Sequence, residues 1–433
     1  MQTAIVIVTL GLIVFLSHYF KGIFSRYTIP DVLWLFLMGI CLGPWWGIVE
    51  PEDFGKIGPV FTTIVLVFIL FESGTDLQFD CLKKSLKGIA GITLLNFLGT
   101  VAILTPLAYY FIGLPLLQSV MLGAILGGTS SAVVTTLIRQ FKVRQETSAI
   151  LVMESALSDV LTLAIPIALM QAYQTNALNV GSITGKIIAS FLFAIMAGCL
   201  GAFLWSILLH YIRNLQNSIF TTPAFVFVVF GIVEILGFSG AIAALAFGIT
   251  LGNVKYLRPP IIKQYIEQEP IELNQTEKNF FSEIVFLLRT FFFIYIGLSI
   301  QLDDMNLVLY GLGFTLLLFL VRIPVVRLSV NTRKTPLLDI SLMSTIIPKG
   351  LGCAVLATLP YQEGIPGGRT IMTLTFSIIL FSTILTTIFV FLVTKTKMIA
   401  VYRLLLSWKK YHVSAHEEHE PMKKLHPREE ISS

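Results

Sequence analysis

Two acidic residues lie five positions apart inside one apolar segment, and they are the residues of this sequence best suited to chemistry. Glu154 and Asp159 occur in a largely apolar stretch that runs from about residue 150 to residue 170. A charged side chain inside a bilayer costs roughly 2.5–3.5 kcal/mol on insertion scales, so such residues default to a functional interpretation. In a helix, five steps place the two carboxylates about 140° apart, so they face different neighbours. We therefore expect one carboxylate to bind a cargo and the other to have a structural partner.

Asp159 is the residue that we expect to hold the cargo. Burial with limited water disfavours the charged form of a carboxylate. Near neutral pH, Asp159 can then exchange a proton for a small hard cation, which prefers oxygen ligands. One site that holds either H⁺ or a monovalent metal ion such as Na⁺ or K⁺, but never both, couples their opposite movements by competition. Ser155 and Ser158 offer further oxygens nearby. The alternative is that Asp159 is the structural partner of a buried base.

Glu154 is the expected structural acid, because basic residues are also present in apolar segments. An arginine stays protonated, so Glu154 paired with Arg322 would form a fixed ion pair between the sixth and eleventh expected helices. Arg289 and Lys349 are the other candidate partners. Arg289 can instead extend toward the cytoplasmic surface while its stem stays in the apolar layer. The sequence leaves open which of the three bases pairs with Glu154.

The composition predicts that these residues lie in an all-α, polytopic membrane protein. Of the 433 residues, 55% are hydrophobic and 13% are charged, whereas ordinary globular domains carry roughly 25% charged residues. Apolar stretches long enough to cross a bilayer predict about thirteen helices (roughly 17–25 residues each). They begin near Thr3, Ile29, Ile57, Gly88, Leu116, Thr147, Ile183, Ile219, Ser239, Phe280, Met305, Leu337 and Thr370. The four cysteines suggest neither a disulfide framework nor a thiolate metal site.

The distribution of basic residues predicts how the helices are oriented. The odd-numbered connections carry most of them, for example Lys83, Lys84 and Lys87 after the third span and Arg139, Lys142 and Arg144 after the fifth. By the positive-inside rule, these connections and the C-terminal tail are cytoplasmic and the N-terminus is outside. We expect a multi-pass protein of the cell (inner) membrane in this orientation.

An inverted repeat is visible as glycines that recur at a fixed spacing. An offset of 223 relates Gly74, Gln78, Asp80, Gly88 and Gly127 to Gly297, Gln301, Asp303, Gly311 and Gly350, and an offset of 209 relates Gly39 and Gly43 to Gly248 and Gly252. The matched helices are seven spans apart, and an odd separation means opposite orientation in the membrane. Inverted-topology repeats are typical of secondary transporters, whose binding site lies where the repeats meet.

The fifth and twelfth expected helices, which the repeat relates, are both interrupted. Residues 127–131 contain two glycines followed by Thr129, Ser130 and Ser131, and residues 347–352 contain Pro348, Lys349 and Gly350. Non-helical backbone at membrane depth survives only where it is buried or lines a cavity. Glycines that merely allow close helix packing would explain the first break but not the second. We expect the hydroxyls to supply cation ligands and Lys349 with Gly350 to balance charge at the break.

Together these features resemble the monovalent cation/proton antiporter superfamily, and in particular its Na⁺/H⁺ exchanger branch of prokaryotic type, over about residues 5 to 395. The resemblance implies thirteen helices, a core ion-transport domain, a scaffold that forms a homodimer, and elevator-like alternating access. It assigns Asp159 to the ion-binding aspartate, Glu154 to the structural glutamate, Arg322 to the core arginine and Lys349 to a position that is often arginine. Ser158 departs from the usual Asn or second Asp, and residues 129–131 replace a common Thr-Asp-Pro.

The implied domains follow the order of the helices. Residues 1–80 would form scaffold and dimerisation helices 1–3, and residues 81–172 core helices 4–6. Residues 173–302 would hold linker helix 7 and scaffold helices 8–10, residues 303–398 core helices 11–13, and residues 399–433 a cytoplasmic tail. That tail contains His412, His416, His419 and His426.

The expected function is exchange of a monovalent cation for H⁺, with Na⁺ first and Li⁺ or K⁺ as alternatives, and electroneutral because Asp159 is the one expected carrier. The alternatives are a K⁺/H⁺ antiporter, or an uncoupled ion channel or sensor on the same fold. An enzyme is disfavoured, because the spans contain neither metal-ligand histidines nor a nucleophile–base pair. No cofactor and no nucleic-acid partner are expected; the partners are the transported ions and the lipid bilayer.

Overall fold

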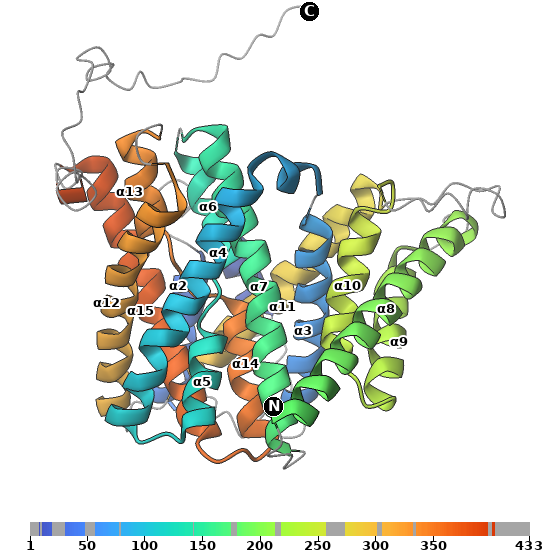
Figure 1. The fold of residues 1–433 in the computed structure, drawn as a ribbon, viewed down its shortest axis with the longest axis horizontal. Coiled ribbons are helices and arrows are strands. Elements are labelled where there is room, and N and C mark those ends of the chain that lie inside the picture. The colour runs from blue at the N-terminus through green and yellow to red at the C-terminus, as the bar shows by residue number, and fades with distance from the viewer. Residues whose placement is uncertain are drawn as a thin grey trace, which may run out of the picture.

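The apolar segments fold as helices that stand side by side, with α12 and α13 at one end of the view in Figure 1 and α8 and α9 at the other. The computed structural model describes residues 8, 11–19, 31–47, 57–77, 79–141, 143–174, 180–212, 218–256, 273–300, 305–331, 335–396 and 401–402. Within these residues there are helices and no strands. Besides a helical segment at 11–19, they are α2 (Asp31–Ile40), η1 (Cys41–Trp45), α3 (Ile57–Asp76), α4 (Phe79–Leu107), η3 (Ala108–Ile112), α5 (Leu116–Ile125), α6 (Ser131–Gln140), α7 (Gln145–Gln174), α8 (Val180–Ile212), η4 (Ser218–Phe220), α9 (Thr221–Ile235), α10 (Gly240–Gly252), α11 (Gln275–Ser299), α12 (Met305–Ser329), α13 (Leu337–Thr345), α14 (Leu351–Gln362) and α15 (Gly368–Lys395).

The predicted membrane architecture is confirmed, including both interruptions. The helices α5 and α6 are the halves of the fifth span, and α13 and α14 are the halves of the twelfth. Among the described residues, six helices are long and apolar enough to cross a membrane on their own, and further shorter apolar helices accompany them. The chain is a multi-pass membrane protein.

Two of the helices begin earlier than the sequence predicted. The fourth begins at Phe79 rather than near Gly88, because the lysine-containing segment before the apolar stretch is also helical. The tenth begins at Gln275 rather than near Phe280. There Asn274 and Glu277 form a reciprocal capping box, which satisfies free N–H groups at the helix start. A hydropathy pattern locates the apolar part of a helix and misses its polar ends.

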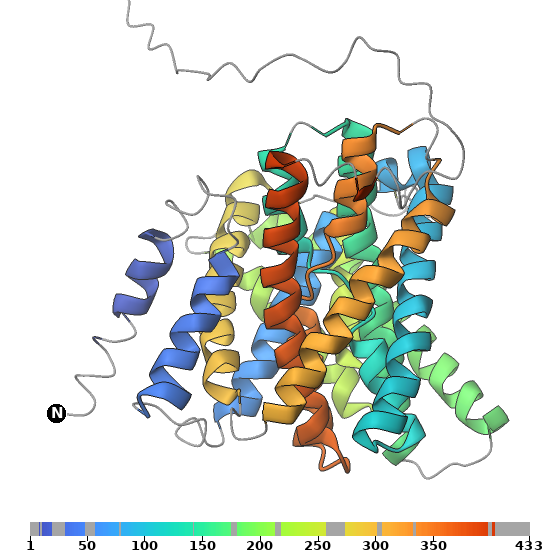
Figure 2. The same cartoon turned by 90° about the vertical axis from the view of Figure 1, so that its left-hand side faces the viewer.

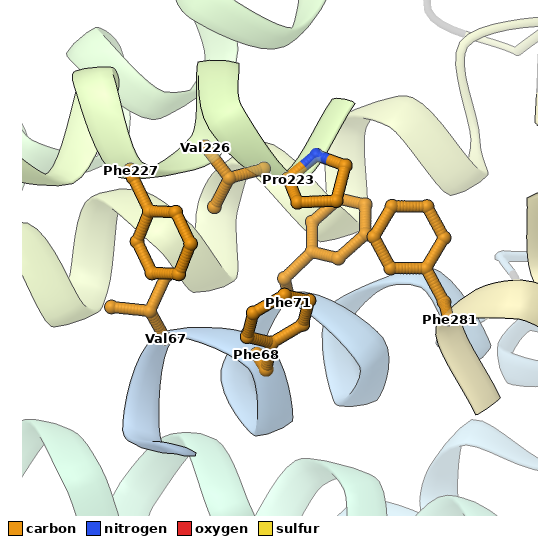
Figure 3. A pocket seen from close by; sticks show the side chains of 7 residues that line it. All are labelled: Val67, Phe68, Phe71, Pro223, Val226, Phe227 and Phe281. Carbon is orange, nitrogen blue, oxygen red and sulfur yellow. The ribbon is translucent and has the colours of Figure 1, made fainter. Parts of the chain in front are cut away.

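The helices pack in two groups. In one, α4 packs against α5, α7 and α12, while α12 packs against α13 and α15. In the other, α10 packs against α3, α8 and α9, and α11 packs against α2 and α3. Figure 2 shows α2 and α11 side by side near the segment 11–19. An apolar junction of α3, α9 and α11 belongs to the second group (Figure 3), lined by Val67, Phe68, Phe71, Pro223, Val226, Phe227 and Phe281.

The glycines of the predicted repeat make equivalent contacts in the two halves. A Cβ built on Gly39 would lie 2.8 Å from the Cα of Gly297, so α2 and α11 touch through their backbones. A Cβ built on Gly248 would lie 3.2 Å from the Cα of Gly74, so α10 and α3 touch in the same way. The repeat relates Gly39 to Gly248 and Gly297 to Gly74, so each contact is the copy of the other. Gln78, Gln301 and Asp303 lie outside the described residues.

These contacts predict that Gly74→Ala destabilises the protein. The new Cβ would lie 2.6 Å from the Leu245 carbonyl oxygen and 2.8 Å from the Ile249 nitrogen, which are backbone atoms that cannot rotate away. Overpacking of this kind typically costs about 1–3 kcal/mol, so we expect a lower unfolding temperature in detergent. Gly231→Ala is the control, because nothing lies within 4 Å of its added Cβ. Equal unfolding temperatures for the two variants would contradict this contact.

Candidate functional site

The two broken helices cross at their interruptions. The backbone N–H of Ser130 donates to the carbonyl oxygen of Pro348 over 2.7 Å, so the two unwound segments are in direct contact. Ser130 also begins α6, since its Oγ accepts from the N–H of Val133 at 3.5 Å. Gly350 permits this approach, because a Cβ at that position would lie 2.6 Å from the Cβ of Ser130. The crossing therefore brings residues 128–131 against residues 348–350 inside the protein.

Polar side chains complete the hydrogen bonds that the first break leaves open. The Lys349 ammonium is 1% exposed, and its Nζ donates to the carbonyl oxygen of Gly128 at 3.0 Å. Asn96 Nδ2 donates to the carbonyl oxygen of Gly127 at 3.4 Å. Lys349 therefore places a positive charge at the C-terminal end of α5, where the helix dipole is negative. Its own N–H donates to Ser382 Oγ at 3.0 Å, which ties the second break to α15.

Glu154 and Arg322 form a buried, bidentate ion pair. Their side chains are 1% and 0% exposed, Nη1 of Arg322 contacts Oε1 of Glu154, and Nη2 donates to Oε2 at 2.6 Å. The remaining Nε–H donates to the carbonyl oxygen of Met343 at 2.9 Å. One arginine thus joins α7, α12 and the first half of the broken twelfth span. Of the three bases that the sequence offered, Arg289 instead lies over the ring of Phe286, at 5.7 Å from its centroid.

Asp159 has a different environment from Glu154. It is half-buried, and no hydrogen bond to its carboxylate is found within the part of the chain that the structure describes. Its Oδ1 points toward the start of α14, 3.9 Å from where a Cβ on Gly352 would lie. Because Gly352 has no side chain, no Cβ from that residue lies against this carboxylate. A carboxylate of this kind can accept a proton or a cation without breaking an existing contact.

Of the predicted hydroxyls, those of Ser158 and Thr129 meet between α7 and the first break. Ser158 Oγ accepts from the N–H of Thr129 at 3.1 Å, lies 3.4 Å from Thr129 Oγ1, and donates to the Ser155 carbonyl oxygen at 2.9 Å. Ser155 Oγ donates back to its own helix, to Val152 at 2.9 Å. Ser131 is half-buried as the first residue of α6. The Ser158 hydroxyl thus lies at the contact between α7 and the first break, whereas the Ser155 hydroxyl bonds to its own helix.

Asp339 is a buried acid that the sequence analysis did not single out. It is 3% exposed in the first turn of α13, and its Oδ2 accepts from Thr147 Oγ1 at 2.7 Å and from the N–H of Arg144 at 3.2 Å. It therefore caps the start of α7 from another helix. Its position in a first helical turn, where acids are favoured, was the available signal, but its partners lie more than 190 residues away.

The site contains oxygen donors and few groups suited to a resident transition metal. Among the described residues, no three His, Cys, Asp or Glu side chains lie close enough to hold a metal ion.

The sequence model for "Sodium/hydrogen exchanger, transmembrane" matches residues 11–396. The chain belongs to this family. The buried ion pair, the Asp159 carboxylate and the crossed helix breaks all lie within the residues that this family model matches.

The individual relatives have low sequence identity to this chain, but they align with most of it. Na(+)/H(+) antiporter 1 of Methanocaldococcus jannaschii is 23% identical over 317 residues, or 70% of each chain. K(+)/H(+) antiporter NhaP2 of Shewanella sp. (strain MR-4) is 23% identical over 385 residues, which cover 86% of this chain and 63% of that protein. This chain thus spans less than two thirds of that K(+)/H(+) antiporter. The structure of the sodium proton antiporter MjNhaP1 from Methanocaldococcus jannaschii at pH 8 aligns with a TM-score of 0.71 at 23% identity, over 91% of this chain and 99% of that one.

Proposed function

We propose that this protein is a secondary antiporter that exchanges a monovalent cation, Na⁺ before Li⁺ or K⁺, for H⁺ by alternating access, with Asp159 as the shared site. The observation that carries the proposal is the contrast between two acids on one helix. Glu154 is neutralised by Arg322, whereas the Asp159 carboxylate has no hydrogen-bond partner among the described residues. Membership of the sodium/hydrogen exchanger family supports the exchange function in this proposal.

The proposed cation site is built from oxygens of α7 and of the first break. Asp159 supplies the charge, and Ser155, Ser158, Thr129, Ser130 and Ser131 supply hydroxyl or carbonyl oxygens, which small hard cations prefer. Lys349 and Gly350 have a separate role in this proposal. Lys349 balances the α5 end through Gly128, and Gly350 lets the breaks cross. Neither has to change charge during transport.

The two packing groups suggest how the site moves. In our proposal the core comprises residues 81–172 and 303–398, and it slides against a scaffold of residues 1–80 and 173–302 that forms a homodimer. The paired glycine contacts of α2 with α11 and α3 with α10 support a rigid scaffold, because close backbone contact leaves little freedom to slide. We place the protein in the cell membrane with the N-terminus outside and the tail in the cytoplasm.

The test is ion flux through purified protein in proteoliposomes. Addition of Na⁺, Li⁺ or K⁺ on one side should drive H⁺ out of the other compartment, read with a pH-sensitive dye, and the order of responses gives the cation preference. K⁺ as the best substrate would favour the K⁺/H⁺ alternative, which the K(+)/H(+) relatives keep open. Cation flux without H⁺ flux would contradict exchange and indicate a channel.

We further predict that transport is electroneutral. Ser158 stands where a second carboxylate would be needed to carry a second proton, and Arg322 stays protonated throughout. The site then holds either H⁺ or one monovalent cation, with the same net charge. An imposed membrane potential at equal pH should move no cation, whereas a pH gradient should. Potential-driven uptake would reveal a second carrier, and Lys349 would be the first residue to examine.

A further inference from the structure

Thr162 has a buried hydroxyl that bonds to nothing in the described part of the chain. The residue is 1% exposed on α7, and its Oγ1 has no hydrogen-bond partner there. Buried threonines elsewhere in these helices donate to the carbonyl oxygen four residues back, as Thr93, Thr290 and Thr315 do at 2.7–2.9 Å. Thr162 makes no such bond to its own helix. An unpaired buried hydroxyl is unfavourable. We therefore ask which ligand could bind the Thr162 hydroxyl in some states of the protein and leave it in others.

The position of Thr162 points to the nature of that partner. On a helix, Ser155, Ser158, Asp159 and Thr162 share an arc of about 100°, with Thr162 inside it. Its Oγ1 faces the first break, because a Cβ built on Gly128 would lie 2.6 Å from it. Ser158, one turn earlier, contacts Thr129 of the same break. Thr162 therefore lies one turn after Ser158 and three residues after Asp159, on the same face of α7.

Other buried hydroxyls without partners do not share this setting. Thr105 on α4 also lacks a hydrogen-bond partner among the described residues. Its Oγ1 faces α5, 3.3 Å from where a Cβ on Gly123 would lie. Of the buried hydroxyls without a partner among the described residues, that of Thr162 is the one on the same helix and the same face as Asp159.

We propose that Thr162 Oγ1 is a further ligand of the transported cation, which rests on the exchange function proposed above. A hydroxyl oxygen can replace one water of a partly dehydrated Na⁺ or Li⁺. It cannot take up the transported proton, because it does not titrate in the physiological range. Thr162 thus acts on one of the two competing ions, stabilising the cation-loaded site and leaving the proton-loaded site unchanged.

This asymmetry gives a test with a specific signature. Thr162→Val keeps the shape and removes the hydroxyl. We expect the apparent KM for Na⁺ and Li⁺ to rise about tenfold at fixed pH, which corresponds to about 1.4 kcal/mol, while the maximal rate stays within about twofold of the parent. Thr162→Ser should restore the parent KM. If valine is not tolerated in folded form, Thr162→Ala makes the same test, because it removes the hydroxyl without adding a methyl group.

Thr105→Val is the matched control, since it removes an equally buried hydroxyl outside the site; its KM should equal that of the parent. A parent-like KM in the hydroxyl-free Thr162 variant, or an unchanged KM with a lower maximal rate, would overturn the proposal and leave Thr162 a packing residue. This outcome is separable from failure of the exchange function itself. In that second case the parent protein would show no cation-driven H⁺ flux, or Asp159→Asn would retain it.

Discussion

Asp159→Asn is expected to abolish cation/proton exchange while leaving the protein folded. Asparagine has the same shape as aspartate but can neither release a proton nor neutralise a cation, so both halves of the competition are lost. The Asp159 carboxylate has no hydrogen bond to lose among the described residues, so stability should change little. The measurement is H⁺ flux in proteoliposomes after addition of Na⁺, beside the elution profile and unfolding temperature in detergent. We expect a loss of at least about a hundredfold, or 2.7 kcal/mol in barrier.

Glu283→Gln provides the control for this loss of charge. Glu283 is on α11, its side chain is 64% exposed, and it lies 3.7 Å from His18. Removal of an exposed carboxylate changes the stability of a protein little, so exchange should continue at the parent rate. Full exchange activity in Asp159→Asn would refute the central assignment, because no other residue in the proposal carries the proton.

Removal of either partner of the Glu154–Arg322 pair should damage the fold more than any other side-chain change proposed for this protein. An uncompensated buried charge typically costs about 3–5 kcal/mol. Arg322→Met additionally leaves the Met343 carbonyl oxygen without the donor that it has now. We expect low yields and markedly lower unfolding temperatures for Glu154→Met and for Arg322→Met. The double variant should recover part of the loss, because apolar residues of similar size can replace a buried pair.

Measurements of stability and of transport on the same variants distinguish the role of Glu154 from that of Asp159. Stable single variants would show that Glu154 is not structural, and it would then become a candidate for the cation site. A double variant that folds and still exchanges ions would show that the pair only supports the site. The double variant has to be more stable than both single variants for the pair to be the cause of the damage.

Much of the fold could be predicted from the sequence because the bilayer restricts it strongly. A span needs an apolar stretch of a certain length, and interruptions such as Pro348 are allowed only where they are buried or line a cavity. The paired glycines of the repeat were also visible as spacings. What the spacings could not give is the contact between Gly39 and Gly297, since the offset relates equivalent residues and says nothing about which of them touch.

The site was less accessible to sequence reasoning. The angle between Glu154 and Asp159 indicated two environments, yet periodicity along one helix cannot say which base of another helix comes near. The structure selects Arg322 over Arg289 and Lys349 through packing between distant segments. Asp339 and Thr162 went unnoticed for related reasons. The first acts across helices, and the second is distinguished by an absent hydrogen bond, which no sequence pattern records.

The ion pair between α7 and α12 also constrains how the protein enters the membrane. Glu154 and Arg322 are 168 residues apart, so at roughly 5–20 residues per second of synthesis the acid waits on the order of ten to thirty seconds for its partner. During that time α7 carries an unneutralised carboxylate that disfavours the lipid phase. We expect α7 to stay beside the insertion machinery until α12 arrives. The helix α13 is inserted after α12. Its Met343 carbonyl oxygen then accepts the remaining hydrogen bond from Arg322.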